Sequence, residues 1–110
     1  MEQNKKYSIS TIGDLESGNY ENIDVELHFE NGMHFIATFI LRSYVNRIMD
    51  EGKEYFWTSD MIIVDELSFD IFKQTIDDLF KEHYFYYAFL PCNELAAKVK
   101  YEHIGNPFEF

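Results

Sequence analysis

Residues 23–39 read IDVELHFENGMHFIATF, and this stretch decides the fold. Its first arm, residues 23–29, alternates strictly between apolar and polar residues, as a half-buried β-strand does. The second arm, residues 33–39, is rich in residues that favour strands, and Asn31-Gly32 between the arms marks a turn. The sequence therefore predicts a β-hairpin with one apolar face.

The length of the turn follows from the side chains that each register places opposite one another. A two-residue loop pairs Phe29 with His34, which sets an apolar ring against a polar one. A three-residue loop with Gly32 in the left-handed conformation pairs Phe29 with Met33 instead. Because a slip of one residue would turn a whole face away from the core, we predict the three-residue loop. It also gives the apolar pairs Leu27–Phe35, Val25–Ala37 and Ile23–Phe39.

Two helices are predicted after the hairpin. Ser43 is placed to cap a short helix that ends at Gly52. Ser68 is placed to cap a longer helix that runs to about Glu82. Asp70 falls in the first turn of this second helix, where the helix dipole favours a negative charge.

Three further segments are expected to be extended. The first is Asp60–Asp65, within which the run Met61–Val64 is apolar without alternation. Such a run is typical of a strand covered on both faces, so we place it in the middle of the sheet. The other two are Tyr55–Trp57 and the aromatic-rich His83–Leu90, which Pro91 closes.

The C-terminal segment allows two interpretations. Lys98–Ile104 alternates weakly and fits a last strand, whereas the sequence NELAA at residues 93–97 could equally open a helix. Strands followed by helices on one sheet predict an α+β fold. We expect an antiparallel or mixed sheet with two helices packed on one face, in a single two-layer domain over residues 1–110, with residues 1–6 disordered.

The composition indicates a folded protein that does not bind nucleic acid. Its 110 residues are 46% hydrophobic and 18% aromatic, enough for one core. Nine Lys and Arg against 20 Asp and Glu give a net charge of −11, whereas nucleic acids are held mainly by Lys and Arg. The single Cys92 cannot form an internal disulfide, and no apolar run has signal-peptide or membrane-spanning length. We therefore expect a cytoplasmic protein without membrane contact, with a monomer favoured.

The negative charge is confined to two segments. Residues 7–41 contain six acidic residues and no Lys or Arg, and residues 54–72 contain five and again no base. The other nine acidic residues are balanced by the nine basic ones. One interpretation is that these carboxylates keep an aromatic-rich domain dissolved and monomeric. The other is a docking surface for a basic protein, in which aromatic side chains supply buried anchors. Its expected residues are Glu21, Asp24, Glu26, Glu30, Tyr55, Trp57, Asp60, Asp65, Glu66 and Asp70.

Signals for catalysis or metal binding are weak. The histidines at 28, 34, 83 and 103 lack an HExxH or paired Cys/His spacing. His28 and His34 project from the hairpin strands as ordinary surface residues. No GxSxG sequence surrounds a serine, and Cys92 has no basic neighbour to lower its pKa. We therefore predict no enzyme, no catalytic residue, no metal site and no cofactor.

The chain resembles small acidic bacterial immunity proteins of polymorphic toxin systems, including those of contact-dependent growth inhibition. The likeness covers roughly residues 20–85 and is most specific in YFWTSDMIIV at residues 55–64. Its other parts are the Asn-Gly turn, Ala37-Thr38-Phe39, the short helix that follows and the later helix with Ile76-Asp77-Asp78-Leu79. The resemblance implies an antitoxin that covers a basic toxin, of nuclease type, but it assigns no role to a particular residue.

Two other functions remain open. A phage-type mimic of nucleic acid would use the same negative field to block a host enzyme, and would compete with DNA or RNA for several basic proteins. A small enzyme or ligand-binding domain would instead place carboxylates in a pocket.

Overall fold

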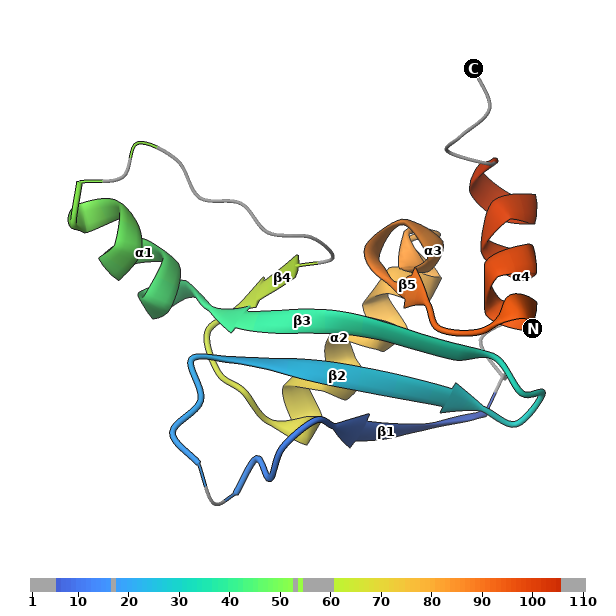
Figure 1. The fold of residues 1–110 in the computed structure, drawn as a ribbon, viewed down its shortest axis with the longest axis horizontal. Helices are drawn as coiled ribbons and strands as arrows, with labels where there is room; N and C mark the ends of the chain where they lie inside the picture. Colours follow the sequence, from blue (N-terminus) through green and yellow to red (C-terminus); the bar gives the residue numbers. More distant parts are fainter. Residues whose placement is uncertain (1–5, 17, 53, 55–60, 106–110) are drawn as a thin grey trace.

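The computed structural model describes residues 6–16, 18–52, 54 and 61–105. In this part of the chain, five strands form one mixed sheet and four helices accompany it (Figure 1). The fold is α+β, as predicted, although it has two more helices than expected. The strands are β1 (Tyr7–Thr11), β2 (Asn22–Phe29), β3 (His34–Leu41), β4 (Met61–Val64) and β5 (Leu90–Pro91). The helices are α1 (Arg42–Asp50), α2 (Phe69–Lys81), α3 (Phe85–Ala88) and α4 (Glu94–Ile104).

The predicted hairpin is confirmed, including its register. Strands β2 and β3 pair antiparallel with Leu27 opposite Phe35. The Phe29 amide donates to the Met33 carbonyl at 2.9 Å, which closes a three-residue loop. Gly32 has φ +97°, a conformation that glycine adopts at little cost.

Strand β4 lies at an edge of the sheet, so its placement in the middle was wrong. Among the described strands, it pairs only with β3, in parallel, and it shares that edge of β3 with the short antiparallel β5. Ile63 is 47% exposed on the face that carries no described helix. The unbroken apolar run therefore does not reflect cover on both faces.

One face of the sheet carries the core. Strands β2 and β3 contribute alternate side chains that are almost fully buried, and α2, α3 and α4 pack onto them (Figure 1). Phe39 contacts Phe72 of α2, and Phe35 contacts Phe85 of α3 edge-on, with centroids 4.7 and 5.1 Å apart. Helix α1 instead extends beyond the end of β3 (Figure 1).

The aromatic segment His83–Leu90 is not one strand. It forms the short helix α3 followed by β5, because Phe85, Tyr86 and Phe89 turn into the core. The C-terminal alternative resolves as a helix. The Asn93 side chain caps α4 by accepting a hydrogen bond from the Ala96 amide at 3.0 Å.

The N-terminal segment holds a strand that the sequence analysis missed. Strand β1 pairs with β2, and the carbonyl of Lys6 accepts a hydrogen bond from the Glu30 amide at 3.0 Å. Lys6, the last residue of the segment 1–6 that was expected to be disordered, is thus hydrogen-bonded to the sheet. Residues 1–5 and the expected strand Tyr55–Trp57 lie outside the described residues.

The two expected serine caps differ, which gives a matched pair of variants. The Ser68 hydroxyl accepts a hydrogen bond from the Ile71 amide at 3.2 Å, as predicted. Ser43 is not a cap, because α1 begins at Arg42 directly from β3 and its cap residue is Leu41. We expect Ser68→Ala to lower the free energy of unfolding by about 1 kcal/mol, as loss of a helix cap does. Ser43→Ala should leave it nearly unchanged in urea denaturation, and equal losses would contradict this assignment.

The opposite face of the sheet carries no helix in the described part of the chain (Figure 1). Its side chains include Asp24, Glu26 and His28 on β2 and His34 on β3. We call it the open face. None of the described helices has the length and apolar character needed to span a membrane.

Candidate functional site

Carboxylates from distant segments meet at one end of the sheet, where β2 begins and β3 and β4 end. Glu21 precedes β2, and its carbonyl accepts a hydrogen bond from the Leu41 amide at 2.9 Å. Leu41 pairs with Val64, the last residue of β4. Asp65 and Glu66 follow Val64 directly and therefore lie at the same end of the sheet as Glu21, with the end of β3 between them.

The β1–β2 loop and the start of α2 belong to the same end. Leu15 and Tyr20 from the loop line a shallow depression of about 350 Å³ together with Asp65 and Glu66. Asp14 and Glu16 flank Leu15, and Asp70 lies in the first turn of α2. All of these carboxylates are exposed or half-buried. We call the following set the acidic end: Asp14, Glu16, Glu21, Asp65, Glu66 and Asp70.

Two arginines of α1 neutralise part of the acidic end. Arg42 holds Asp65 in a bidentate pair, with Nε–Oδ1 at 2.9 Å and Nη2–Oδ2 at 3.2 Å. Arg47 holds Glu21 in the same way, and this hydrogen bonding keeps the pKa of the Glu21 carboxyl below its ordinary value. Two guanidinium groups against six carboxylates leave a formal charge of 2 − 6, or −4.

The structure gathers only some of the predicted binding residues. Glu21, Asp65, Glu66 and Asp70 are brought together at the acidic end. Asp24 and Glu26 point from the middle of β2 onto the open face, and Asp24 accepts a hydrogen bond from the Thr38 hydroxyl at 2.6 Å. Glu30 sits in the hairpin turn, at the other end of β2. Tyr55, Trp57 and Asp60 lie outside the described residues.

Asp14 and Glu16 belong to the acidic segment of residues 7–41 but are not among the expected binding residues. The missing information was the path of the β1–β2 loop, which depends on β1. Residues 7–11 read YSIST, and this alternation was the available signal for the strand.

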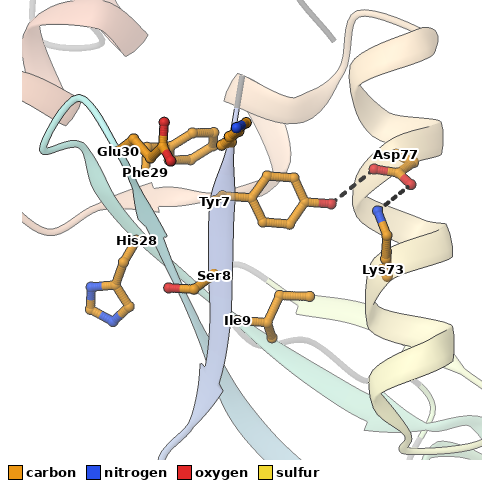
Figure 2. Close-up of a pocket in the computed structure, with 9 residues that line it drawn as sticks. Tyr7, Ser8, Ile9, His28, Phe29, Glu30, Lys73 and Asp77 are labelled. Carbon is orange, nitrogen blue, oxygen red and sulfur yellow. Dashed lines mark hydrogen bonds and ion pairs between the residues drawn. The ribbon is translucent and has the colours of Figure 1, made fainter. Parts of the chain in front are cut away.

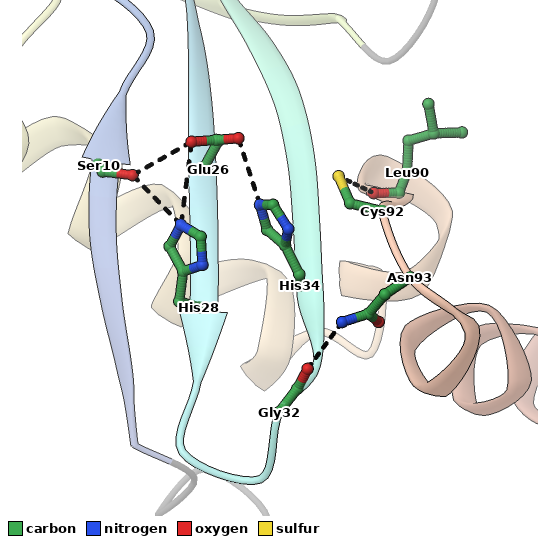
Figure 3. Close-up of polar contacts among 8 residues, drawn as sticks. All are labelled: Ser10, Glu26, His28, Gly32, His34, Leu90, Cys92 and Asn93. Carbon is green, nitrogen blue, oxygen red and sulfur yellow. Dashed lines mark hydrogen bonds and ion pairs between the residues drawn. The ribbon is translucent and has the colours of Figure 1, made fainter.

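The open face carries a second group of polar side chains (Figure 3). Glu26 Oε2 lies 3.3 Å from His34 Nε2, and Glu26 Oε1 lies 3.9 Å from His28 Nε2. The two imidazole rings stack, with centroids 4.2 Å apart. The Ser10 hydroxyl donates to Glu26 Oε1 at 3.4 Å. The histidines are therefore neighbours in one cluster, not isolated surface residues.

Cys92 lies at the border of the open face, and its amide donates to the His34 carbonyl at 2.8 Å (Figure 3). Partial burial, and to a smaller extent the charge of Glu26, raise the pKa of the Cys92 thiol. Because the thiolate is the reactive form, this thiol is poorly suited to nucleophilic chemistry at neutral pH.

A groove of about 800 Å³ runs along β1, and three of its polar residues, Tyr7, Lys73 and Asp77, contact one another (Figure 2). The Tyr7 hydroxyl donates to Asp77 Oδ1 at 2.8 Å, and Lys73 Nζ lies 3.1 Å from Asp77 Oδ2. Burial, followed by the hydrogen bond and charge of Asp77, raises the pKa of Tyr7 above its ordinary value. This arrangement links β1 to α2 through side-chain contacts.

The Tyr7 contact gives a prediction with a defined pH dependence. Tyr7→Phe should lower the free energy of unfolding by about 1 kcal/mol at neutral pH, because it removes one hydrogen bond. Since the pKa of Tyr7 is raised in the folded state, its contribution is complete below pH 10, about the pKa of an unfolded tyrosine, and is lost as the pH rises further. Urea denaturation should show a constant difference from wild type up to pH 9 that shrinks above pH 10. A difference independent of pH would contradict the Tyr7–Asp77 contact.

Comparison with known proteins adds no assignment, because no protein-family model, curated protein or solved structure matches the chain.

Proposed function

We propose that this protein is an immunity protein, which binds a basic toxin of nuclease type and covers its surface. The observation that supports this most strongly is the acidic end. Three stretches of chain, residues 14–21, 65–66 and the start of α2, contribute six carboxylates there. A nuclease needs Lys and Arg to hold phosphates, so its substrate-binding surface is positively charged. Electrostatic potentials of opposite sign on the two surfaces raise the association rate of such partners and fix their relative orientation.

Apolar side chains beside these carboxylates favour a protein partner. Tyr20 and Phe69 are large exposed hydrophobic residues that directly precede Glu21 and Asp70 of the acidic end. Protein interfaces place such residues in a buried centre and polar residues at the rim. An interface of standard size buries about 1,600 Å² in total, roughly 800 Å² on each partner. These side chains supply apolar surface for the centre of such an interface, and the acidic end supplies polar surface for its rim.

The proposal is tested by capture and by growth. The full chain is used as bait in its native cell, and the product of the adjacent reading frame is tested as a candidate partner. We expect one basic protein to be captured, and to stop growth only when this chain is not expressed. Capture of several unrelated basic proteins, with release by added DNA or RNA, would favour the nucleic-acid mimic instead. A cell that tolerates the captured protein without this chain would contradict the immunity function.

A further inference from the structure

We propose that Glu26, His28 and His34 form a binding site for a divalent transition-metal ion on the open face. Two histidines and one carboxylate are a common ligand set for zinc and its first-row neighbours. The ligand atoms of these three residues all lie within 4.8 Å of one another. The proposal concerns a different surface from the acidic end and does not depend on the immunity function.

The hairpin positions all three ligands on rigid backbone. His28 and His34 face each other across β2 and β3, and Glu26 is two residues before His28 on the same face. Both strands are in the middle of the sheet, because β1 flanks β2 and both β4 and β5 flank β3. The Cys92 amide also donates a hydrogen bond to the His34 carbonyl, from the edge of β3 that faces away from β2. Sites built on such strands hold their ligands more accurately than sites on loops.

The present separations are close to those of a metal site. In a tetrahedral zinc site with ligands at 2.0–2.1 Å, neighbouring ligand atoms are about 3.3 Å apart. Glu26 Oε2 lies 3.3 Å from His34 Nε2, and the other oxygen, Oε1, lies 3.9 Å from His28 Nε2. With three protein ligands, the fourth position of the ion would be filled by water on this exposed face.

His34 supplies the observation that points most directly to a ligand. Its Nε2 atom is buried, yet it has no hydrogen-bond partner among the described residues. Glu26 Oε2, at 3.3 Å, is an ion-pair partner only when His34 is protonated, and the contact does not have hydrogen-bond geometry. Buried polar atoms of native proteins nearly always have a partner, so an unsatisfied nitrogen facing a carboxylate needs an explanation. A metal ion between these two groups would provide the missing partner.

Metal binding requires one local rearrangement. The imidazoles stack with an interplanar angle of 23°. A metal ion lies near the plane of each imidazole that binds it, so two nearly parallel rings cannot point both Nε2 atoms at one ion. At least one ring must turn about its χ2 torsion, which is broad and nearly two-fold for histidine. Loss of the stack is thus a specific consequence of binding at this site.

The test is a titration of the full chain, without an affinity tag, with ZnCl₂ by calorimetry and by NMR of the histidine ring protons. We expect one equivalent to bind, with ring signals of His28 and His34 shifting together. Single variants His28→Ala, His34→Ala and Glu26→Gln should each weaken binding by more than about 100-fold, beyond the 10–100-fold typical of residues that only support a ligand. Ser10→Ala, which removes such a supporting contact, should weaken it by about tenfold.

Two control variants separate this site from other zinc ligands. Cys92→Ser removes the only thiol, and His83→Asn removes a histidine remote from the cluster. Asparagine tolerates the positive φ of 66° at that position. Both variants should bind zinc as wild type does. Binding that survives the three ligand substitutions, binding lost with Cys92→Ser, or several weak equivalents spread over the surface carboxylates would each overturn the proposal. Circular dichroism confirms that every variant is folded.

Discussion

Phe85→Ala is expected to lower the free energy of unfolding by about 3–5 kcal/mol, the usual cost of removing a buried phenylalanine ring. Phe85 is 1% exposed and lies at the centre of the aromatic core. It stacks on Phe80 of α2 and on Phe89, with centroids 4.2 and 4.7 Å apart. It also meets Phe29 and Phe35 of the sheet edge-on. The variant would therefore leave a cavity where helix α2, helix α3 and the sheet meet.

The matched control for this variant is Tyr87→Ala in the same short helix. Tyr87 is 63% exposed, so its truncation should change stability by less than about 0.5 kcal/mol. Urea denaturation of both variants measures the difference. Because domains of this size are stable by only about 5–15 kcal/mol, Phe85→Ala should lower the midpoint clearly. Equal effects of the two variants would mean that residues 85–89 do not pack as described.

Reversing charges at the acidic end is expected to slow association with the basic partner about tenfold at physiological salt. The triple variant Glu16→Lys, Glu66→Lys and Asp70→Lys changes the net charge from −11 to −11 + 6, or −5. None of these three residues has an ion-pair partner among the described residues, so the fold should persist. Asp70→Lys alone costs about 0.3–1 kcal/mol through the helix dipole. Stopped-flow or surface-based kinetics with the captured partner measures the effect.

A control with the same net charge isolates the position of the charges. Asp78→Lys, Glu82→Lys and Glu102→Lys replace exposed carboxylates elsewhere on the surface. Glu82 lies about 18 Å from Asp70 along α2, at 1.5 Å per residue. This is roughly twice the screening length at physiological salt. The control variant should therefore associate nearly as fast as wild type. Equal slowing by both variants would show that total charge, and not the acidic end, governs the encounter.

Local patterns predicted the parts of the fold that depend on local interactions. The alternation of residues 23–29 and the Asn31-Gly32 turn determine the hairpin and its register. Ser68 determines where α2 begins. Residues 61–64 and 83–90 were misplaced because their apolar runs indicate burial without saying which neighbours provide it. Their partners, β3 for one and the aromatic core for the other, are set by tertiary contacts.

In the candidate sites, too, local sequence patterns predicted some features and tertiary contacts set the others. The charge count identifies the two acidic segments, but which carboxylates share one end of the sheet depends on its topology. Glu21 and Asp65 do so because β2 begins at the end where β3 and β4 finish. Glu30 was misplaced, since it follows the last residue of β2 at the opposite end. The cluster of Glu26, His28 and His34 was missed because these residues are close across strands and not along the chain. The predicted three-residue turn already placed His28 opposite His34, so the register was the available signal.

The most direct test of the central claim is the association rate of the wild-type protein with its captured partner, measured across ionic strength. If the acidic end meets a cationic surface, the rate should fall steeply as salt rises from about 10 to 500 mM, because the Debye length shrinks from about 30 Å at 10 mM to a few ångströms. The triple variant should show a much shallower decline, while the control variant keeps the steep one. A wild-type rate that is independent of salt, or equal slopes for all three proteins, would contradict the account.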